Sequence, residues 1–311
     1  MTELLKVSYD EVKVDVRGFY SKSLLDNQHL ESIGSSFLDG YHDSLTSKSL
    51  TSLCKTLDQK ENIYSGFAYE GAAMGLVITD FFRFKSNRRF YHFLQNEGSH
   101  HAYMLHVGAG WAYAKLPLNI EKVTLKYDPL LRWLIIDGYG FHQAYFKTRQ
   151  YVYEKKKPKL SPVATPIFYQ GVGRCLWFIE GTSVRRITDR IKTFPVAYHP
   201  DLWAGIGLAA VYAGVVEAYE LKQLKQLSGE YEAHLMQGAA FAAKARQRAE
   251  NVLAYTEMAV KILTGLDLNE AALITDEALA QISTSKIEKT EYETWRMLIR
   301  DKLSVYETSI L

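Results

Sequence analysis

Glycines recur at an almost constant interval along most of this chain of 311 residues. Gly138 lies 67 residues after Gly71, and Gly205 lies 67 residues after Gly138. Four more glycines complete the series, with gaps of 30 to 37 residues: Gly40, Gly108, Gly171 and Gly238. Each lies in a stretch with the composition of an apolar helix, such as FAYEGAAMGLVI around Gly71. A period of about 33 residues is typical of helical repeat proteins, so we expect an all-α protein.

The glycines also predict how the helices meet. Glycine inside a helix costs about 1 kcal/mol relative to alanine, and repeating that cost indicates that neighbouring helices approach closely at these positions. A glycine-bearing apolar helix followed by a shorter polar helix or a loop builds either an open α/α superhelix of the tetratricopeptide type or a closed α/α toroid. The period is close to the tetratricopeptide period of about 34, but the full signature of that repeat is missing. Both shapes therefore stay open.

The same patterns divide the chain into three parts. Residues 1–23 form an N-terminal arm, whose polar and apolar residues alternate from Val12 to Val16 and indicate a short strand or an extended segment. Residues 24–265 form the glycine-bearing repeat domain. Residues 266–311 form C-terminal capping helices that lack the glycine signal, as expected at the end of a repeat array.

Two segments of the repeat domain stand out. YEKKKPKLSPVATP, residues 153–166, combines prolines with a run of lysines and is expected to be an exposed loop. Leu202–Val216 is the longest run without Asp, Glu, Lys, Arg or His, and its 15 residues are fewer than the roughly 18 to 20 that a membrane-spanning helix needs. We therefore expect a buried helix over 201–219.

Composition excludes several classes of function. The 37 basic and 35 acidic residues give a net charge of +2, which is not the strongly basic surface that nucleic-acid binding requires. The two cysteines, Cys54 and Cys175, form no disulfide framework and fit a reducing cytosol. The first residues, MTELLKVSYDEV, lack the apolar core of a signal peptide. We expect a cytoplasmic protein with no transmembrane segment and no nucleic-acid partner.

Two carboxylates are the best candidates for chemistry. Glu70 and Asp137 each precede a repeat glycine inside an apolar helix. A carboxylate in such surroundings is either paired or has a raised pKa. Equivalent positions on neighbouring repeats would bring both groups to one surface, where they could act as acid and base. The alternative is that each forms a structural pair with a nearby arginine, Arg132 or Arg174, or caps a neighbouring helix.

Other candidates follow from residue type and position. His142, in GYGFHQAYF, is a candidate for proton transfer. A buried arginine needs a carboxylate partner or an anionic ligand, so Arg174 either binds substrate or belongs to a structural ion pair. Aromatic residues in the helices either fill a large core or line a ligand cavity. The candidate substrate-binding residues are Arg174, His106, Tyr139, Trp111, Tyr169 and Trp177.

No cofactor or metal site is expected. Glu97 and His101 have the i, i+4 spacing of a metal pair, but no HExxH or paired-cysteine pattern accompanies them. The chain also has no phosphate-binding loop, no dinucleotide-binding fingerprint after a strand and no GxSxG elbow. Aspartate-rich DDxxD and DxDD clusters are missing, which argues against the familiar types of terpene cyclase.

Several motifs in chain order resemble a known family. They are RGFY (17–20), LESIGSSFLDGYHDSL (30–45), YEGAAMG (69–75), HAYMLHVGAGWAYAKL (101–116), DPLLRWLIIDGYGFHQAYF (128–146), QGVGRCLWFIEG (170–181), GIGLAAVYAG (205–214) and QGAAFAAKAR (237–246). The family is the UnbL-type domain of unknown function, which occurs in enediyne polyketide gene clusters and in other bacterial clusters. The resemblance covers roughly residues 17–265, and the lysine-rich loop and the C-terminus depart from it. It implies a bacterial, cytosolic protein of specialised metabolism and supplies no catalytic residues.

These observations lead to two hypotheses. In the first, the protein is an enzyme of natural product biosynthesis that cyclises, isomerises or otherwise rearranges a hydrophobic polyketide or terpenoid-like substrate without a redox cofactor. Glu70, Asp137 and His142 would then transfer protons, and Arg174 would hold a carboxylate or another anionic group. In the second, the protein is a non-catalytic binding module for a hydrophobic product, a peptide or a carrier protein. A closed cavity favours the enzyme, and an open groove favours the binding module.

Overall fold

The computed structural model describes residues 5–83, 88–282 and 290–310. Every regular element in these ranges is helical, and they contain no strand, which confirms the all-α prediction. Within the same ranges, no helix is both long and apolar enough to cross a membrane.

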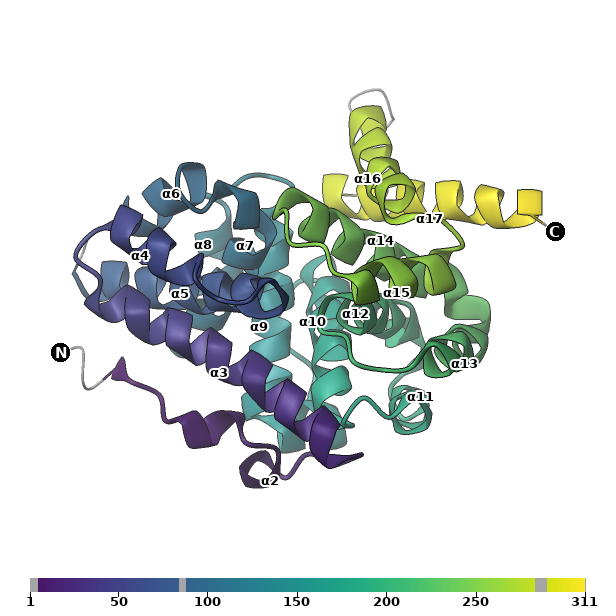
Figure 1. Cartoon of the computed structure of the whole chain (residues 1–311), viewed down its shortest axis with the longest axis horizontal. Coiled ribbons are helices and arrows are strands. Elements are labelled where there is room, and N and C mark those ends of the chain that lie inside the picture. The colour runs from purple at the N-terminus through teal and green to yellow at the C-terminus, as the bar shows by residue number, and fades with distance from the viewer. Residues whose placement is uncertain (1–4, 84–87, 283–289, 311) are drawn as a thin grey trace.

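The helices that carry the repeated glycines form one continuous row. They are α3 (Leu24–Thr46), α5 (Asn62–Phe82), α7 (Ala102–Lys115), α9 (Arg132–Phe146), α10 (Ala164–Ile179), α12 (His199–Tyr212) and α14 (Glu232–Arg248). Each helix packs against the next one in chain order, and the row curves into an all-α superhelix (Figure 1). We call these the glycine helices.

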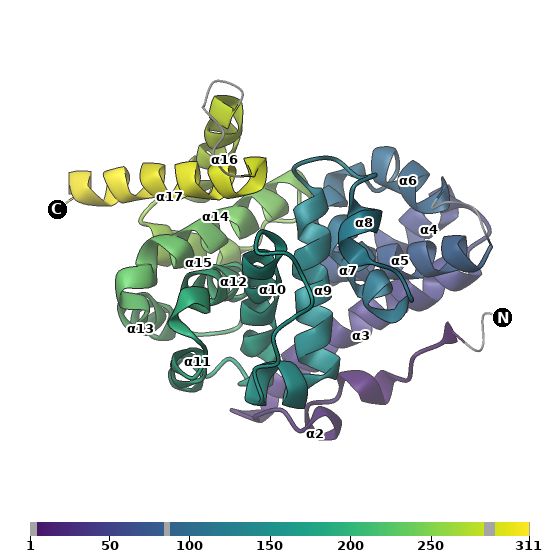
Figure 2. The same ribbon diagram turned by 180° about the vertical axis from the view of Figure 1, so that it is seen from behind.

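Shorter helices connect the members of this row. They are α4 (Leu50–Leu57), α6 (Arg88–Gln95), α8 (Ile120–Thr124), α11 (Val184–Lys192) and α13 (Ala218–Ser228). A further short helix, α15 (Ala254–Thr264), follows α14 and packs against α12, α13 and α14. Two further helices, α16 (Leu268–Ile282) and α17 (Glu291–Ile310), lie beside α14 at the far end of the row (Figure 2). The proline- and lysine-rich segment contains no regular helix from 154 to 163, so the loop prediction is confirmed.

Pairs of glycines two residues apart explain the close packing. Gly138 lies against the carbonyl oxygen of Val107 on α7, and Gly140 lies against that of Phe168 on α10. Three other pairs contact the preceding and the following helix in the same way: Gly108 and Gly110, Gly171 and Gly173, and Gly205 and Gly207. A Cβ atom at any of these positions would overlap neighbouring backbone, so each pair lets one helix approach both of its neighbours.

Neighbouring glycine helices run parallel. Between α9 and α10, Gln170 bonds to Asp137, and further along both helices Phe178 packs against Phe141 with ring centroids 5.5 Å apart. Residue numbers therefore rise together on the two helices. Parallel neighbours need a return connection, and the connecting helices and loops provide it.

Side chains bridge the two ends of the row. Arg246 on α14 donates to the carbonyl oxygens of Asn62 and Ile63 at the start of α5, at 2.9 and 3.2 Å. Its guanidinium also donates to the carbonyl of Tyr212, where α12 ends. On α3, His29 Nε2 lies 2.7 Å from the carbonyl oxygen of Ala213. The superhelix is therefore bridged on the side that the row alone would leave open.

The N-terminal segment, residues 5–20, contacts α3 and the ends of α9 and α10, and it differs from the strand expectation. It forms a 3₁₀ turn at Tyr9–Val12 and a short helix, α2 (Val14–Arg17). The Ser8 side chain accepts a hydrogen bond from the backbone of this turn, and Gly18, with φ of 66°, ends α2. These local caps favour helical turns over the extended conformation that the alternation of polar and apolar residues suggested.

The helix expected over 201–219 is split in two. The structure ends α12 at Tyr212 and begins α13 at Ala218. Gly214 and Val215 between them both adopt positive φ, 81° and 75°. A β-branched residue rarely adopts this conformation, so the sequence gives no warning of the break at Val215.

Candidate functional site

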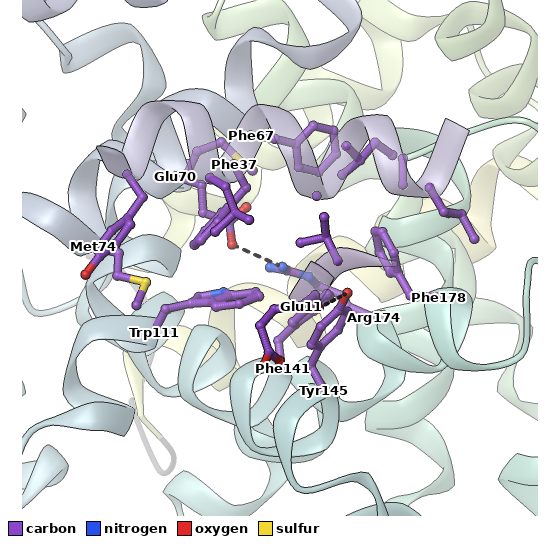
Figure 3. A pocket seen from close by; sticks show the side chains of 18 of the residues that line it. Glu11, Phe37, Phe67, Glu70, Met74, Trp111, Phe141, Tyr145, Arg174 and Phe178 are labelled. Atoms are coloured by element: carbon purple, nitrogen blue, oxygen red, sulfur yellow. Dashed lines mark hydrogen bonds and ion pairs between the residues drawn. The ribbon is translucent and has the colours of Figure 1, made fainter. Parts of the chain in front are cut away.

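An apolar cavity lies on the concave side of the glycine helices. Its walls come from α3, α5, α7, α9, α10, α12 and the N-terminal segment, and side chains converge on it from all sides (Figure 3). The space inside it that is open to the centre of a water molecule is only about 70 Å³. The cavity is therefore a narrow slot, which suits a slender molecule better than a bulky one.

Aromatic rings from several helices form much of the wall. They belong to Phe37, Phe67, Trp111, Phe141, Tyr145 and Phe178. The Trp111 ring lies at their centre, with its centroid 4.4 Å from that of Phe37 and 5.2 Å from that of Phe141. Such a wall favours an apolar or conjugated ligand, because aromatic side chains offer large flat surfaces for burial.

Arg174 on α10 is the centre of a buried charge cluster. Its Nη1 donates to Asp137 Oδ1 at 2.7 Å, and Gln170 Nε2 donates to the other carboxylate oxygen of Asp137 at 2.8 Å. Asp137 is fully buried. Burial is the largest influence on the Asp137 pKa and raises it, while Arg174 and Gln170 oppose the shift. The structural pairing considered for Asp137 is thus present, and Asp137 lies behind Arg174 rather than on the cavity wall.

Glu70 on α5 faces the same guanidinium from the cavity side. Glu70 Oε1 lies 3.8 Å from Arg174 Nη2 (Figure 3). Burial raises the pKa of Glu70 from 4.5 to about 7, the Asp137 charge adds to this rise, and Arg174 and Trp111 oppose it. A carboxyl group with a pKa near neutrality can both accept and return a proton, which is the property of a general acid–base catalyst.

Three polar atoms on the cavity wall are buried and have no hydrogen-bond partner: Glu70 Oε1, Trp111 Nε1 and the Tyr212 hydroxyl oxygen. The Trp111 N–H lies toward Glu70, and the Tyr212 hydroxyl lies toward Asn251, without a complete hydrogen bond in either case. Buried polar atoms in proteins are nearly always satisfied. These atoms therefore mark the part of the cavity where a polar group of a ligand would find partners.

His142, a predicted catalytic residue, lies one layer behind the wall. Its ring packs against Trp111 and Phe146, with centroid distances of 5.6 and 4.7 Å. Neither ring nitrogen has a hydrogen-bond partner. Burial lowers the pKa of His142 to about 3, and nearby lysine and arginine charges lower it further. The imidazole is neutral at physiological pH and does not line the cavity.

Four predicted substrate-binding residues also lie outside the cavity wall. His106 Nδ1 bonds at 2.7 Å to a carbonyl of the preceding helical turn, and Trp177 Nε1 donates at 3.3 Å to a carbonyl just beyond α12. Tyr169 stacks on another tyrosine with centroids 3.9 Å apart, and Tyr139 borders a separate surface pocket. The structure thus brings Glu70, Trp111 and Arg174 together at the cavity and gives these four residues packing contacts elsewhere.

The rim of the cavity contains polar residues that the sequence analysis missed. Glu11 of the N-terminal segment and Lys115 at the end of α7 line the cavity, and both reach solvent. Arg17 pairs with Glu11 at 2.9 Å and also donates to the carbonyl of Tyr145. Lys115 could have been inferred, because it follows Trp111 by one helical turn. Nothing in the sequence of the N-terminal segment indicates that it covers a cavity.

The arrangement is suited to proton transfer next to a stabilised negative charge. Glu70 can exchange a proton with a ligand, and Arg174 Nη2 is directed at the same region of the cavity. Across the described ranges, no group of three or more His, Cys, Asp or Glu side chains converges as a metal site would require.

Comparison with curated proteins finds no match, and comparison with solved structures finds none either. A family model does match, over residues 1–303, and its description is a protein of unknown function, DUF1702. Because that match spans nearly the whole sequence, the chain belongs to the DUF1702 family.

Proposed function

We propose that the protein is an enzyme that binds a slender, apolar substrate in this cavity and rearranges it without oxidation or reduction, with Glu70 as the acid–base residue. The observation that carries the proposal is the carboxyl group of Glu70. It is buried on an apolar wall, has a pKa of about 7 and an unpartnered oxygen, and lies 3.8 Å from a guanidinium. Strongly shifted titratable groups in cavities are typical of catalytic sites.

The chemistry that fits this pair begins with removal of a proton next to a carbonyl. The Glu70 carboxylate accepts the proton from the carbon, the C–H electron pair forms an enolate, and Arg174 Nη2 stabilises the negative oxygen. The protonated Glu70 then returns the proton. In a substrate with a double bond conjugated to the enolate, return of the proton to the far end of that conjugated system gives an isomer. If the enolate carbon first attacks a second carbonyl of the same chain, return to the new alkoxide oxygen gives a ring.

Asp137 and Gln170 act through Arg174 in this scheme. Asp137 neutralises the guanidinium and, together with Gln170, fixes its position. Because Arg174 already has a buried carboxylate partner, it is better suited to a developing enolate than to a permanent carboxylate of the substrate. The resemblance to the UnbL-type domain supports a polyketide-like substrate, in which carbonyl groups are spaced along a linear chain.

Deuterium uptake tests the proposed step without knowledge of the product. A linear apolar ketone is incubated with the protein in D₂O, and mass spectrometry measures deuterium incorporated next to the carbonyl. We expect uptake well above the rate in buffer, rising with pH through about 7 because the carboxylate form of Glu70 is the base. Glu70→Gln should abolish the protein-dependent uptake.

Glu11→Gln is the matched control, because Glu11 lines the same cavity at its rim and has no role in the proposed step. This variant should retain uptake. A ketone that binds to wild-type protein but acquires no deuterium would contradict the enzymatic proposal.

A second candidate function is storage or sequestration of a hydrophobic product. It is favoured by the apolar walls and by the N-terminal segment, which covers the cavity. The same coverage argues against an open groove for a peptide or a carrier protein. Binding without deuterium uptake, and with an affinity unchanged in Glu70→Gln, would support this candidate.

A further inference from the structure

A second apolar compartment adjoins the cavity. It lies among α7, α9, α10, α12, α14 and α17, and the space in it that is open to the centre of a water molecule is about 40 Å³. Leu134, Phe241 and Trp295 form part of its wall, and Ala245 of α14 is among its half-buried members. None of these four residues lines the first cavity.

Four side chains belong to the walls of both compartments: Met104, Arg174, Leu208 and Tyr212. They form a partition between the two spaces. Leu208 is only partly buried although the residues on either side of it are buried, and its side chain lines both compartments. Met104 has a flexible unbranched side chain that adapts to a ligand, so a slender chain can pass between the compartments.

The polar groups of the site lie at this partition. Arg174 and Tyr212 are shared by both walls, and Glu70 faces Arg174 from the larger compartment. On either side of them the walls are mainly apolar. A ligand whose polar group stood at one end of its chain would fill only one compartment and leave the other empty.

We propose that the ligand is an elongated apolar molecule with its carbonyl group inside the chain, and that the two arms flanking this carbonyl occupy the two compartments. The larger compartment takes the longer arm and the smaller one takes the shorter arm, since the space open to the centre of a water molecule is about 70 Å³ in the first and about 40 Å³ in the second. This inference rests on the proposed binding of a carbonyl group at Glu70 and Arg174, and it adds the position of that group along the chain.

Ketones of one length but different carbonyl position test the inference. Tridecan-2-one, tridecan-5-one and tridecan-7-one have the same formula, so differences in their affinity reflect the position of the carbonyl. Each ketone is titrated into protein that holds a fluorescent linear polyene acid. The fluorescence change as the polyene is displaced gives the affinity for the ketone. The 5-ketone, with unequal arms, should bind at least about tenfold more tightly than the 2-ketone, and the 7-ketone should lie between them.

Two alanine-to-phenylalanine variants separate the compartments. Ala245→Phe fills only the second compartment. It should leave the affinity for the 2-ketone unchanged and lower the affinity for the 5-ketone to the same value. Ala209→Phe, on the wall of the first compartment alone, should weaken all three ketones. Ala245→Leu provides a smaller substitution if the phenylalanine variant does not fold, and thermal unfolding checks each variant.

The outcomes distinguish this inference from the proposed function. Equal affinity for the three ketones, or an equal effect of Ala245→Phe on all of them, would overturn the two-compartment site and leave the proton-transfer proposal standing. The expected ranking without deuterium uptake would support the two-compartment site and contradict catalysis. If no ketone displaces the polyene, both proposals are wrong.

Discussion

At the scale of single residues, two carboxylates at equivalent repeat positions have different environments. Asp137 and Arg174 are on adjacent helices and form a 2.7 Å ion pair, whereas Glu70 reaches the same guanidinium across the cavity at 3.8 Å. Asp137 is therefore neutralised inside the protein. Glu70 keeps an unsatisfied oxygen on the cavity wall, and this difference makes Glu70 the reactive member of the two.

The raised pKa of Glu70 predicts a pH dependence of stability. The carboxyl group of Glu70 has its ordinary pKa of 4.5 in the unfolded chain and a pKa of about 7 in the folded protein. Between pH 4.5 and pH 7 the folded state therefore holds a proton that the unfolded state has lost. The free energy of unfolding should therefore fall as pH rises through this window, by on the order of 3 kcal/mol from this group. Denaturant unfolding at pH 5 and pH 8 should show that Glu70→Gln removes much of the fall. An unchanged difference between the two pH values would contradict the assignment.

Removal of Arg174 should be costly, because it leaves the Asp137 carboxylate buried without its cation. We expect Arg174→Met to lower the free energy of unfolding by about 3 to 5 kcal/mol. The double variant Arg174→Met with Asp137→Leu should recover most of this loss. Arg149→Met is the control, because Arg149 pairs with Glu154 at the exposed surface and its removal should cost less than about 1 kcal/mol.

At the scale of elements, the paired glycines determine how close the helices lie. Each pair places the backbone of one helix against carbonyl oxygens of its two neighbours. The helices that the pairs join are buried on nearly every face, as α10 illustrates with all but a few of its residues inside. The glycines thus serve as interface residues on both sides of a helix, whereas a surface helix buries only one stripe.

A substitution at one of these glycines tests the packing. Gly138→Ala would place a methyl group on the carbonyl oxygen of Val107, so α7 and α9 must separate. We expect a net loss of about 1 to 3 kcal/mol in unfolding free energy, despite the better helix propensity of alanine. At Gly34, an added methyl group would meet the Val12 side chain of the N-terminal segment. Gly34→Ala should cost less, because this segment can shift; equal losses would argue against the backbone contacts as the cause.

The all-α architecture could be predicted from the sequence, but the site could be predicted only in part. Each of the repeated glycines expected inside an apolar helix lies in one, because the apolar residues around it favour a helix. The faces of the glycine helices could not be distinguished, because helices that are apolar all round carry no periodic signal. Trp111 and Trp177 looked equivalent for this reason, although only Trp111 lines the cavity.

At the scale of the whole molecule, Arg246 joins the two ends of the superhelix. It is fully buried and has three carbonyl oxygens as partners, from the start of α5 and the end of α12. Its guanidinium also lies over the Tyr212 ring, 4.0 Å from the centroid. This one side chain therefore connects the second glycine helix to the last two, and it keeps the cavity bounded on the bridged side.

Loss of this bridge should loosen the start of α5 before the rest of the protein. We expect Arg246→Met to lower the free energy of unfolding by about 2 to 4 kcal/mol, since three carbonyl oxygens lose a charged donor and the bond to the Tyr212 carbonyl is fully buried. Hydrogen exchange should accelerate most at the first turn of α5. Arg248→Met is the control, because Arg248 is exposed, bonds to the Ser99 carbonyl at 3.2 to 3.3 Å and lies over the Tyr103 ring, and none of these contacts joins it to α5 or α12. Uniform acceleration over all helices would contradict a local role.

The spacing of the glycine pairs also limits how the length of this protein can change. One residue inserted into a glycine helix would rotate everything beyond it by about 100° around the helix axis, and at least one glycine of the pair would leave its interface. Insertions in the connecting segments, such as the loop from 154 to 163, impose no such rotation. Homologous chains should therefore differ in length at their connections while the glycine helices keep their number of residues, and foreign segments should be tolerated in the same connections.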